Sequence, residues 1–300
     1  MKNVLIIYYS QSGQLKQIAD QISQPFLKDE NIQVDYYQIQ MQNEFPFPWN
    51  KDSFFGAFPD SFQQIPHQIL PPSDVILNTN YDLILFHYQV WFLTPSIPIN
   101  SFLKSNYAKK ILQNKPVVTI SGSRNMWALA QDKMKVLLRN NQAQLVGNIA
   151  LVDRNINLVS VVSIVDWMFS GVKRKAYGIF PLPGVSDKEI TESIKFGEII
   201  HDFFKSNNYS NLQPKLVANG AVEFRYFLIS MDKKANKMFK IWSKIILSNP
   251  NKKKILSKLF NYYLFIAIWI LSPIVHLIET ILYPILFFKI KKQKKYYQGI

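Results

Sequence analysis

Short apolar runs alternate with segments of helical periodicity along the first two-thirds of the chain. Five of these runs have the length and the β-branched and aromatic content of strands buried on both faces of a parallel sheet. They cover residues 3–9, 32–39, 81–88, 116–120 and 144–152. Because strands and helices alternate, the pattern predicts an α/β fold with a five-stranded parallel sheet and right-handed crossovers.

Helices are predicted after the first, fourth and fifth strands. Behind the first strand, apolar residues fall on one helical face, at Leu15, Ile18, Ala19 and Ile22. A second helix is predicted at about 126–138. The third covers 187–205, where Ser186 is the predicted N-cap and Glu189 follows three residues later. We therefore expect one domain over residues 1–205, a linker at 206–221 and a separate tail at 222–300.

Two insertions interrupt the alternation. Residues 41–75 contain FPFPW and FFGAFP and are too rich in Pro and Phe for a regular helix, and residues 157–183 hold a second apolar stretch. Long loops inside a compact domain are usually functional or disordered, and the aromatic content argues against disorder. Both insertions are therefore expected to cover a site.

Three loops at the carboxyl ends of the predicted strands have unusual compositions, and ligands of open α/β sheets bind at this edge. The first, Ser10–Gln14, offers two hydroxyls, an amide and backbone N–H groups at a helix N-terminus, which suit a phosphate. The alternative is a simple N-cap turn. This loop alone does not decide between the two.

The other two loops carry large aromatic side chains. Residues 89–98 place Trp91 and Phe92 after a buried strand, where they would stack on a flat ligand or pack against the 41–75 insertion. Residues 121–127 combine Gly122, polar donors and Trp127, although an ordinary strand-to-helix turn would look similar. One phosphate loop and two aromatic loops at the same sheet edge together predict a flavin site.

These segments resemble the flavodoxin and quinone-reductase superfamily over roughly residues 1–205, most clearly in the stretch FHYQVWFLTPSIPINSFLK. The resemblance implies a flavodoxin-like, doubly wound fold that binds FMN. Leu15 departs from the hydroxyl that flavodoxins often have there, which removes one phosphate contact. The implied contacts are Ser10, Ser12, Gly13 and Gln14 for the phosphate, Trp91 and Phe92 for the isoalloxazine, and Gly122, Ser123 and Trp127 for the ring or ribityl chain.

More narrowly, the whole chain resembles the dialkylresorcinol condensing enzyme family. That resemblance implies oxidation of an apolar cyclic diketone or quinone-like ring to a dialkylresorcinol in aryl-polyene or flexirubin-type biosynthesis, with a ketosynthase and an acyl carrier protein as partners. A bound flavin accepts hydride in such chemistry. The alternative function is a flavin-free, membrane-associated protein that docks an acyl chain or an acyl carrier protein.

No catalytic acid or base can be assigned from the sequence. The candidates near the predicted site are His87, Tyr88, Arg124, Asp166 and Tyr177. His87 is more simply interpreted as a core histidine, and Asp166 would equally suit a helix cap. The chain has no cysteine, which excludes disulfides, thiolate metal sites and cysteine nucleophiles, and no metal site is predicted.

Positive charge is concentrated in the tail. Of the net +15, residues 1–205 contribute +2, from 19 Lys and Arg against 17 Asp and Glu. Residues 206–300 contribute +13, from 16 against 3. Such a tail suits nucleic acid or an anionic membrane. Nucleic acid is rejected because the lysines alternate with aliphatic runs and no nucleic-acid motif is present.

The tail combines a basic amphipathic helix with a long apolar segment. Apolar residues recur every three or four positions from Phe224 to Ile245, and residues 259–278 contain no Asp, Glu, Lys or Arg. Lysines flank the apolar segment on both sides, which favours an interfacial insertion or a hairpin bent at Pro273 and Pro284. The alternative is a helical hairpin that closes over the flavin site. Both would hold for a lipid-like substrate.

The N-terminal run Met1–Tyr9 is interpreted as a strand and not as a signal peptide, because no small-residue cleavage site follows it. We therefore expect a cytoplasmic protein that is attached, peripherally or integrally, to the inner face of the cytoplasmic membrane through residues 222–300.

Overall fold

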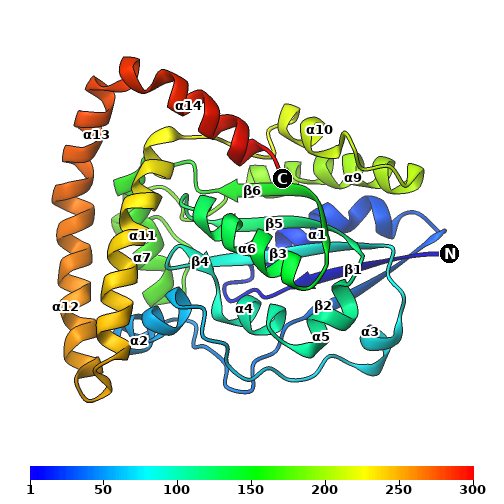
Figure 1. Cartoon of the computed structure of the whole chain (residues 1–300), viewed down its shortest axis with the longest axis horizontal. Coiled ribbons are helices and arrows are strands. Elements are labelled where there is room, and N and C mark those ends of the chain that lie inside the picture. The colour runs from blue at the N-terminus through cyan, green and yellow to red at the C-terminus, as the bar shows by residue number, and fades with distance from the viewer.

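The computed structural model describes all 300 residues, and a twisted parallel sheet lies at its centre (Figure 1). Five parallel strands are arranged in the order β2-β1-β3-β5-β6, and a short β4 pairs antiparallel with the end of β3. This order reverses direction between β1 and β3, as in the flavodoxin-like doubly wound fold. The predicted fold class is confirmed. The strands are β1 (Lys2–Tyr8), β2 (Ile32–Gln38), β3 (Leu83–Trp91), β4 (Thr94–Pro95), β5 (Pro116–Ser123) and β6 (Gln144–Val152).

Helices cover both faces of the sheet, and each face has its own apolar core. Ile6 and Ile18 belong to the core on one face, and Ile7 and Phe102 to the core on the other. The first face is covered by α1 (Gln14–Leu27), α8 (Asp187–Glu192), α9 (Ile194–Ser206) and α10 (Leu212–Ala218). The second is covered by α3 (Asp74–Asn78), α4 (Ile97–Leu103), α5 (Asn106–Leu112) and α6 (Ala128–Asn140).

Three segments are more regular than the sequence indicates. The 41–75 insertion contains α2 (Lys51–Phe62), whose N-cap Asn50 accepts a hydrogen bond from the Ser53 N–H at 2.8 Å, so the expectation of an irregular segment was wrong. The 157–183 insertion contains α7 (Asn157–Ser170) and a short turn, η1 (Ala176–Gly178). Residues 206–221, expected as a linker, contain α10, which packs against β6.

The predicted helix at 187–205 is divided into α8 and α9 at Ser193. Its predicted start is confirmed, because the Ser186 side chain accepts the Glu189 N–H and the Glu189 carboxylate accepts the Ser186 hydroxyl at 3.2 Å. This reciprocal pair satisfies donors at the helix N-terminus that have no intrahelical partner.

The tail is a set of helices that wraps one side of the domain and then returns to it (Figure 1). By length and composition, its helical stretch Pro250–Ile281 could cross a membrane: its most apolar 18-residue window has a mean hydropathy of 2.0, and only 11% of that window is buried. The direction changes near Pro284, as predicted, whereas the helix continues through Pro273. The elements are α11 (Tyr226–Leu247), η2 (Pro250–Lys252), α12 (Lys253–Ile266), the π-helical turn η3 (Ala267–Leu271), α13 (Ser272–Ile281) and α14 (Tyr283–Gln298).

A third apolar cluster joins the tail to the 41–75 insertion. Phe58 of α2 stacks face to face on Phe260 of α12, with ring centroids 3.8 Å apart and planes 7° from parallel. Phe239 of α11 packs edge-on against both rings. Helices α11 and α12 of the tail therefore pack against the 41–75 insertion.

The buried face of α11 differs from its predicted apolar stripe. Asp232 and Ser243 are fully buried, whereas Met238 and Ile245 are exposed. The helix was predicted correctly, but it packs between the domain and α12, so its contacts on two sides do not follow a single stripe.

Candidate functional site

The first loop joins β1 to α1 and leaves the start of the helix open. Gly13 precedes α1 with φ +84°, a left-handed backbone conformation that favours glycine, and it is exposed. The Ser10 hydroxyl accepts the Lys16 N–H at 3.2 Å, so this side chain caps the helix. The first amides of α1 have no intrahelical acceptor, which makes this helix start suitable for an anion.

The Gln14 side chain is bound to the protein itself. Its Oε1 accepts the Val185 N–H at 2.9 Å and its Nε2 donates to the Val185 carbonyl at 2.9 Å. This pairing, which resembles the pairing of two strands, brings the Gln14 side chain close to the backbone of Gly184. A Cβ on Gly184 would lie 2.6 Å from Gln14 Oε1, and the φ of +82° at this position also favours glycine. The side-chain oxygen and one side-chain N–H of Gln14 are therefore engaged by the protein, and the backbone N–H is available to a phosphate.

The buried carboxylate of Asp153 holds the segment Gly184–Val185 that contacts Gln14. Asp153, at the end of β6, accepts the Ser160 hydroxyl at 2.7 Å and the Gly184 N–H at 3.3 Å. It also accepts the Asn155 N–H at 2.9 Å. These bonds tie the end of β6, α7 and the segment before α8 into one wall beside the first loop.

The second loop is a tight hairpin between β3 and β4. Phe92 and Leu93 both have positive φ, 48° and 65°, which is costly for residues with a Cβ and is typical of positions that are held by their surroundings. Phe92 packs against Phe54 and Phe58, with centroids 4.8 and 5.3 Å away. The hairpin is therefore fixed by the α2 insertion.

Trp91 lies in an aromatic cluster at the same place. Its ring meets Phe45 edge-on at 5.0 Å, Trp49 at 5.3 Å and Tyr9 at 6.1 Å. These contacts match the alternative interpretation of the sequence, in which Trp91 and Phe92 pack against the 41–75 insertion. Both Trp91 and Phe92 nevertheless remain half-buried and line a cavity.

The third loop begins later than predicted, because β5 continues to Ser123. Gly122 and Ser123 therefore lie at the strand end and not in a turn. The Ser123 hydroxyl and the Gln89 Oε1 are both buried at the cavity without a hydrogen-bond partner. Such groups are costly to bury unless a ligand satisfies them, so they indicate polar ligand atoms here.

Arg124 adds a positive charge to this wall. Its guanidinium donates to Asn157 Oδ1 at 2.8 Å and to the Asn157 carbonyl at 3.2 Å. Burial lowers the pKa of Arg124 to about 10, and the nearby Asp153 charge opposes that shift. The group therefore stays charged at neutral pH and favours an anionic ligand.

One cavity of about 1200 Å³ brings most of the predicted residues together. It is bounded by all three loops, by α7 and by the inner sides of α11, α12 and α13, and most of its lining is hydrophobic. Pockets for small molecules usually occupy about 300–1,000 Å³, so a tricyclic ligand and an apolar substrate would both have room. The predicted residues that line it are Ser12, Gln14, Trp91, Phe92, Gly122 and Ser123.

Trp127 is not among them, and its predicted role as a flavin contact is not supported by its position. The side chain is buried in the core on the α1 side and meets Tyr297 edge-on at 6.3 Å. Because its partner is far away in the sequence, the local pattern around Trp127 gave no sign of this contact. Ser10 and Gly13 belong to the first loop but do not line the cavity.

The acid and base candidates are mostly engaged elsewhere. His87 is fully buried, and burial lowers its pKa to about 4, so it is a neutral core histidine. The Tyr88 hydroxyl donates to Gln131 Oε1 at 2.7 Å in the core. Asp166, inside α7, pairs at 3.0 Å with Arg174, which follows the helix, and does not cap a helix. Tyr177 is exposed at the cavity rim.

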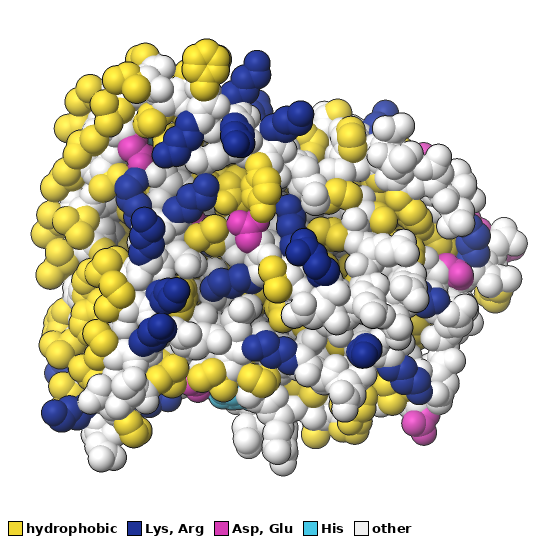
Figure 2. Space-filling model, in the orientation of Figure 1, with side chains coloured by type: hydrophobic (Ala, Val, Ile, Leu, Met, Phe, Trp, Pro, Cys, Tyr) yellow, Lys and Arg dark blue, Asp and Glu magenta, His cyan; other side chains and the backbone are white.

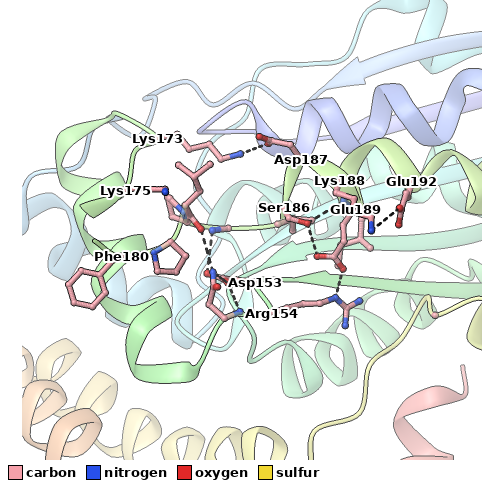
Figure 3. Close-up of a pocket in the computed structure, with 18 of the residues that line it drawn as sticks. Asp153, Arg154, Lys173, Lys175, Phe180, Ser186, Asp187, Lys188, Glu189 and Glu192 are labelled. Carbon is pink, nitrogen blue, oxygen red and sulfur yellow. Dashed lines mark hydrogen bonds and ion pairs between the residues drawn. The ribbon is translucent and has the colours of Figure 1, made fainter. Parts of the chain in front are cut away.

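A second cavity, of about 840 Å³, lies behind Gly184 (Figure 3). Its charged groups point toward one another: Lys173 pairs with Asp187 at 2.6 Å, and Arg154 pairs with Glu189. With the Lys188–Glu192 pair, they engage six of the nine charged side chains that line this cavity. The segment Gly184–Val185 separates it from the first cavity, so we place the candidate site in the larger, apolar one.

Several lining residues were not singled out from the sequence. Gln89 was visible only as a polar residue at a strand end, and Trp49 as part of FPFPW. The Trp49 indole donates to Gln11 Oε1 at 2.9 Å, while the Gln11 amide donates to the Pro46 carbonyl at 2.9 Å. The composition of the insertion indicated that it covers a site; these bonds show which part of the first loop it covers.

No protein-family model matches the chain, and no curated protein matches it significantly. Among solved structures, a flavoprotein from Lactobacillus acidophilus in complex with FMN is 21% identical, with a TM-score of 0.39, over 50% of this chain and 93% of its own. Flavodoxin 1 from Bacillus cereus, in its oxidised form, is 14% identical over 66% of this chain and 95% of its own, with a TM-score of 0.36.

A flavodoxin from the domain Archaea is 13% identical over 68% of this chain and 99% of its own, with a TM-score of 0.36. At these identities the likeness concerns the fold alone. The fold class rests on the strand order β2-β1-β3-β5-β6, which is that of a flavodoxin-like doubly wound sheet.

Proposed function

We propose that this protein is an FMN-dependent oxidoreductase that acts on an apolar ring. The supporting observation is the single cavity that runs from the first loop, past the aromatic hairpin and the strand end of β5, to the apolar tail helices. Its polar end has an anion-binding helix start, and its other end is hydrophobic. A phosphate-bearing flavin and a lipid-like substrate would fit these two ends.

Named residues would hold the cofactor. The backbone amides of Ser12 and Gln14, at the positive end of the α1 dipole, would bind the phosphate. Trp91 and Phe92 would contact the ring, and the unpartnered oxygens of Gln89 and Ser123 would bind its polar edge. The orphaned polar atoms are the test of fit, because a purely apolar ligand would leave them unsatisfied.

Bound FMN would supply a two-electron acceptor for the hydride that the substrate ring loses together with a proton to solvent, and an external quinone or dioxygen would serve as the final oxidant. The protein's own contribution is to orient the ring and exclude water with the aromatic hairpin and α7. We further propose a cyclic diketone with long alkyl chains as substrate and a dialkylresorcinol as product, because the tail helices extend the apolar end of the cavity.

The cofactor assignment is tested on the purified full-length protein. We expect the absorbance of oxidised flavin and, for added FMN, quenching of its fluorescence on binding. Trp91→Ala should weaken FMN binding by about tenfold, because one aromatic contact with the ring is lost. Trp242→Ala is the matched control, since Trp242 does not line the cavity. Equal FMN affinity in both variants would contradict this placement of the ring.

A colourless protein that fails to take up FMN would instead favour the alternative function, a flavin-free protein that docks an acyl chain or an acyl carrier protein. For the substrate, we expect dialkylated cyclohexanediones to be oxidised faster as their chains lengthen, with the resorcinol product identified by mass spectrometry. A rate that does not depend on chain length would contradict the assignment of the apolar end.

A further inference from the structure

The helical column formed by α12, η3 and α13 has two apolar faces. On its inner face, residues such as Leu264, Ile268 and Val275 line the cavity and are half-buried. On its outer face a row of large hydrophobic side chains is exposed: Tyr262, Ile266, Ile270, Ile274, Leu277, Ile278 and Ile281. Figure 2 shows hydrophobic side chains along the outer edge of the molecule where Figure 1 places this column.

The column is fastened to α11 at its two ends. At one end, Glu279 of α13 is buried and accepts hydrogen bonds from Ser230 and Lys234. At the other end, Trp242 packs against Phe260 and Tyr263 at 5.9 and 5.6 Å. Between these contacts, the middle parts of both helices line the cavity, including Met231 and Ala235 of α11.

A π-helical turn, η3, lies in the middle of the column. Such turns are rare and often occur at functional sites, because the extra residue widens the helix. Ala267, at the start of η3, lines the cavity, while Trp269 and Leu271 in the same turn both line it and remain exposed. The turn therefore connects the cavity lining with the outer surface.

Charge on both sides of the apolar row matches an anionic lipid surface. Lys237, Lys240 and Lys244 of α11 are exposed, and Figure 2 shows Lys and Arg side chains in a band beside the apolar edge. Further lysines occur at 252–254, at the start of the column, and at 289–295, in α14 beyond its other end. Each lysine near an anionic surface contributes about 1 kcal/mol to attraction.

We propose that α11 and the α12–α13 column form a lateral portal, through which an apolar molecule passes from a lipid bilayer into the cavity. The outer face enters the acyl region of one leaflet, and the lysines bind the phospholipid phosphates. The column lies in the plane of the membrane, because its inner face contacts the domain and only its outer face is free for lipid. What reacts in the cavity rests on the proposed function; the portal does not require it.

The test uses the full-length protein with vesicles of phosphatidylcholine and phosphatidylglycerol that contain a long-chain alkylbenzophenone as photoreactive probe. After illumination, mass spectrometry locates the labels. The proposal predicts labels on the outer face, at Ile266 and Ile270, and also on the inner face, at Ile268 and Met231. Labels on the outer face alone, or no labels, would overturn it.

Two variants narrow the portal from opposite sides. Ala267→Trp and Ala235→Trp should each lose the inner-face labels and keep the outer ones, and the pair protects the test against one variant that fails to fold. Ile270→Trp is the matched control, because Ile270 is exposed and does not line the cavity. Inner labels that persist in both folded narrowing variants would overturn the portal.

Labelling does not depend on bound flavin, so this experiment separates the two proposals. Failure of FMN binding with the expected labels contradicts the proposed function alone. FMN binding with outer labels only contradicts the portal alone. Association of the outer face with a second copy of the chain, seen as dimers and loss of vesicle flotation, would also contradict the portal.

Discussion

Gly184 is the residue at which the wall behind α1 comes closest to the first loop. A side chain here would meet Gln14 Oε1 at 2.6 Å and Trp167 Cζ3 at 2.9 Å. The next residue, Val185, pairs with the Gln14 side chain: its N–H donates to Gln14 Oε1, and its carbonyl accepts from Gln14 Nε2. One small residue therefore decides whether the two walls of the candidate site can close.

We predict that Gly184→Ala destabilises the protein by about 2–4 kcal/mol, since it combines a positive φ with a steric clash. Gly178→Ala is the control, because Gly178 has a similar φ of +73° but nothing within 4 Å of a Cβ. The difference between the two variants in the free energy of unfolding, measured with urea, gives the energetic cost of the steric clash alone. Equal destabilisation would mean that the contact with Gln14 adapts without cost.

At this scale, sequence patterns identified positions at the site but not the direction of every side chain. Trp91 is the last residue of β3 and Trp127 follows β5 closely, yet Trp91 lines the cavity and Trp127 is buried in a core. Trp127 packs against Tyr297, a residue near the end of the chain that a local pattern does not reveal. Likewise, the Gln14 side-chain amide was expected to bind phosphate, but it binds Val185, which is also distant in the sequence.

Among the elements, α11 contains a buried acid where it packs on α6. Asp232 Oδ2 accepts the Leu129 N–H at 3.1 Å, while Oδ1 has no partner. Burial raises the pKa of Asp232 to about 7, although the hydrogen bond from the Leu129 N–H and the positive charge of Lys133 oppose this shift. The folded state therefore keeps a proton that the unfolded state releases above its ordinary pKa of 3.8.

This proton makes stability depend on pH with a definite sign. The contribution of Asp232 to the free energy of unfolding should fall as pH rises from about 4 to about 7, by at most about 1.4 kcal/mol per pH unit, and level off above that range, whereas the buried His87 contributes a slope of opposite sign between about pH 4 and 6.5. Asp232→Asn should remove the contribution of Asp232, because Asn keeps an acceptor for Leu129 and does not titrate. Asp52→Asn, at a largely exposed position, should leave it unchanged. Parallel pH profiles for Asp232→Asn and the unaltered protein would disprove the coupling.

The elements that the sequence predicted best are those with strong local periodicity, such as the five strands and α1. Helix α2 was missed because Pro59 and adjacent phenylalanines looked irregular, whereas Phe54, Phe58 and Phe62 in fact share a helical face that is buried by other elements. The break at Ser193 was missed as well, because the apolar spacing continues through it. Long-range packing, which a local pattern does not contain, decided both cases.

In the whole molecule, α14 returns to the domain and closes a loop formed by the tail (Figure 1). Tyr297 is buried in the core on the α1 side, and Gln213 donates to the Gln298 carbonyl at 2.9 Å. The adjacent Tyr296 is exposed and donates to Asp132 at 3.0 Å. The tail is thus fixed at its far end and is not a detachable appendage.

We predict that Tyr297→Ala lowers the free energy of unfolding by about 3 kcal/mol, as expected for the loss of a buried aromatic side chain. Tyr296→Ala is the matched control and should cost less than about 1 kcal/mol, because that ring is exposed. Thermal unfolding of both variants in the same detergent provides the comparison. A small effect of Tyr297→Ala would mean that α14 contributes little to holding the tail.

The stacking of Phe58 on Phe260 affects how the chain matures during translation. Phe58 leaves the ribosome early, whereas its partner is synthesised about two hundred positions later. Until then the aromatic side of α2 is covered only in part, by Phe92 of the β3–β4 hairpin, because α12 has not yet been synthesised. Nascent chains of this protein should therefore expose an apolar surface that binds chaperones, and this surface is covered only when the long apolar helix of the tail has been synthesised.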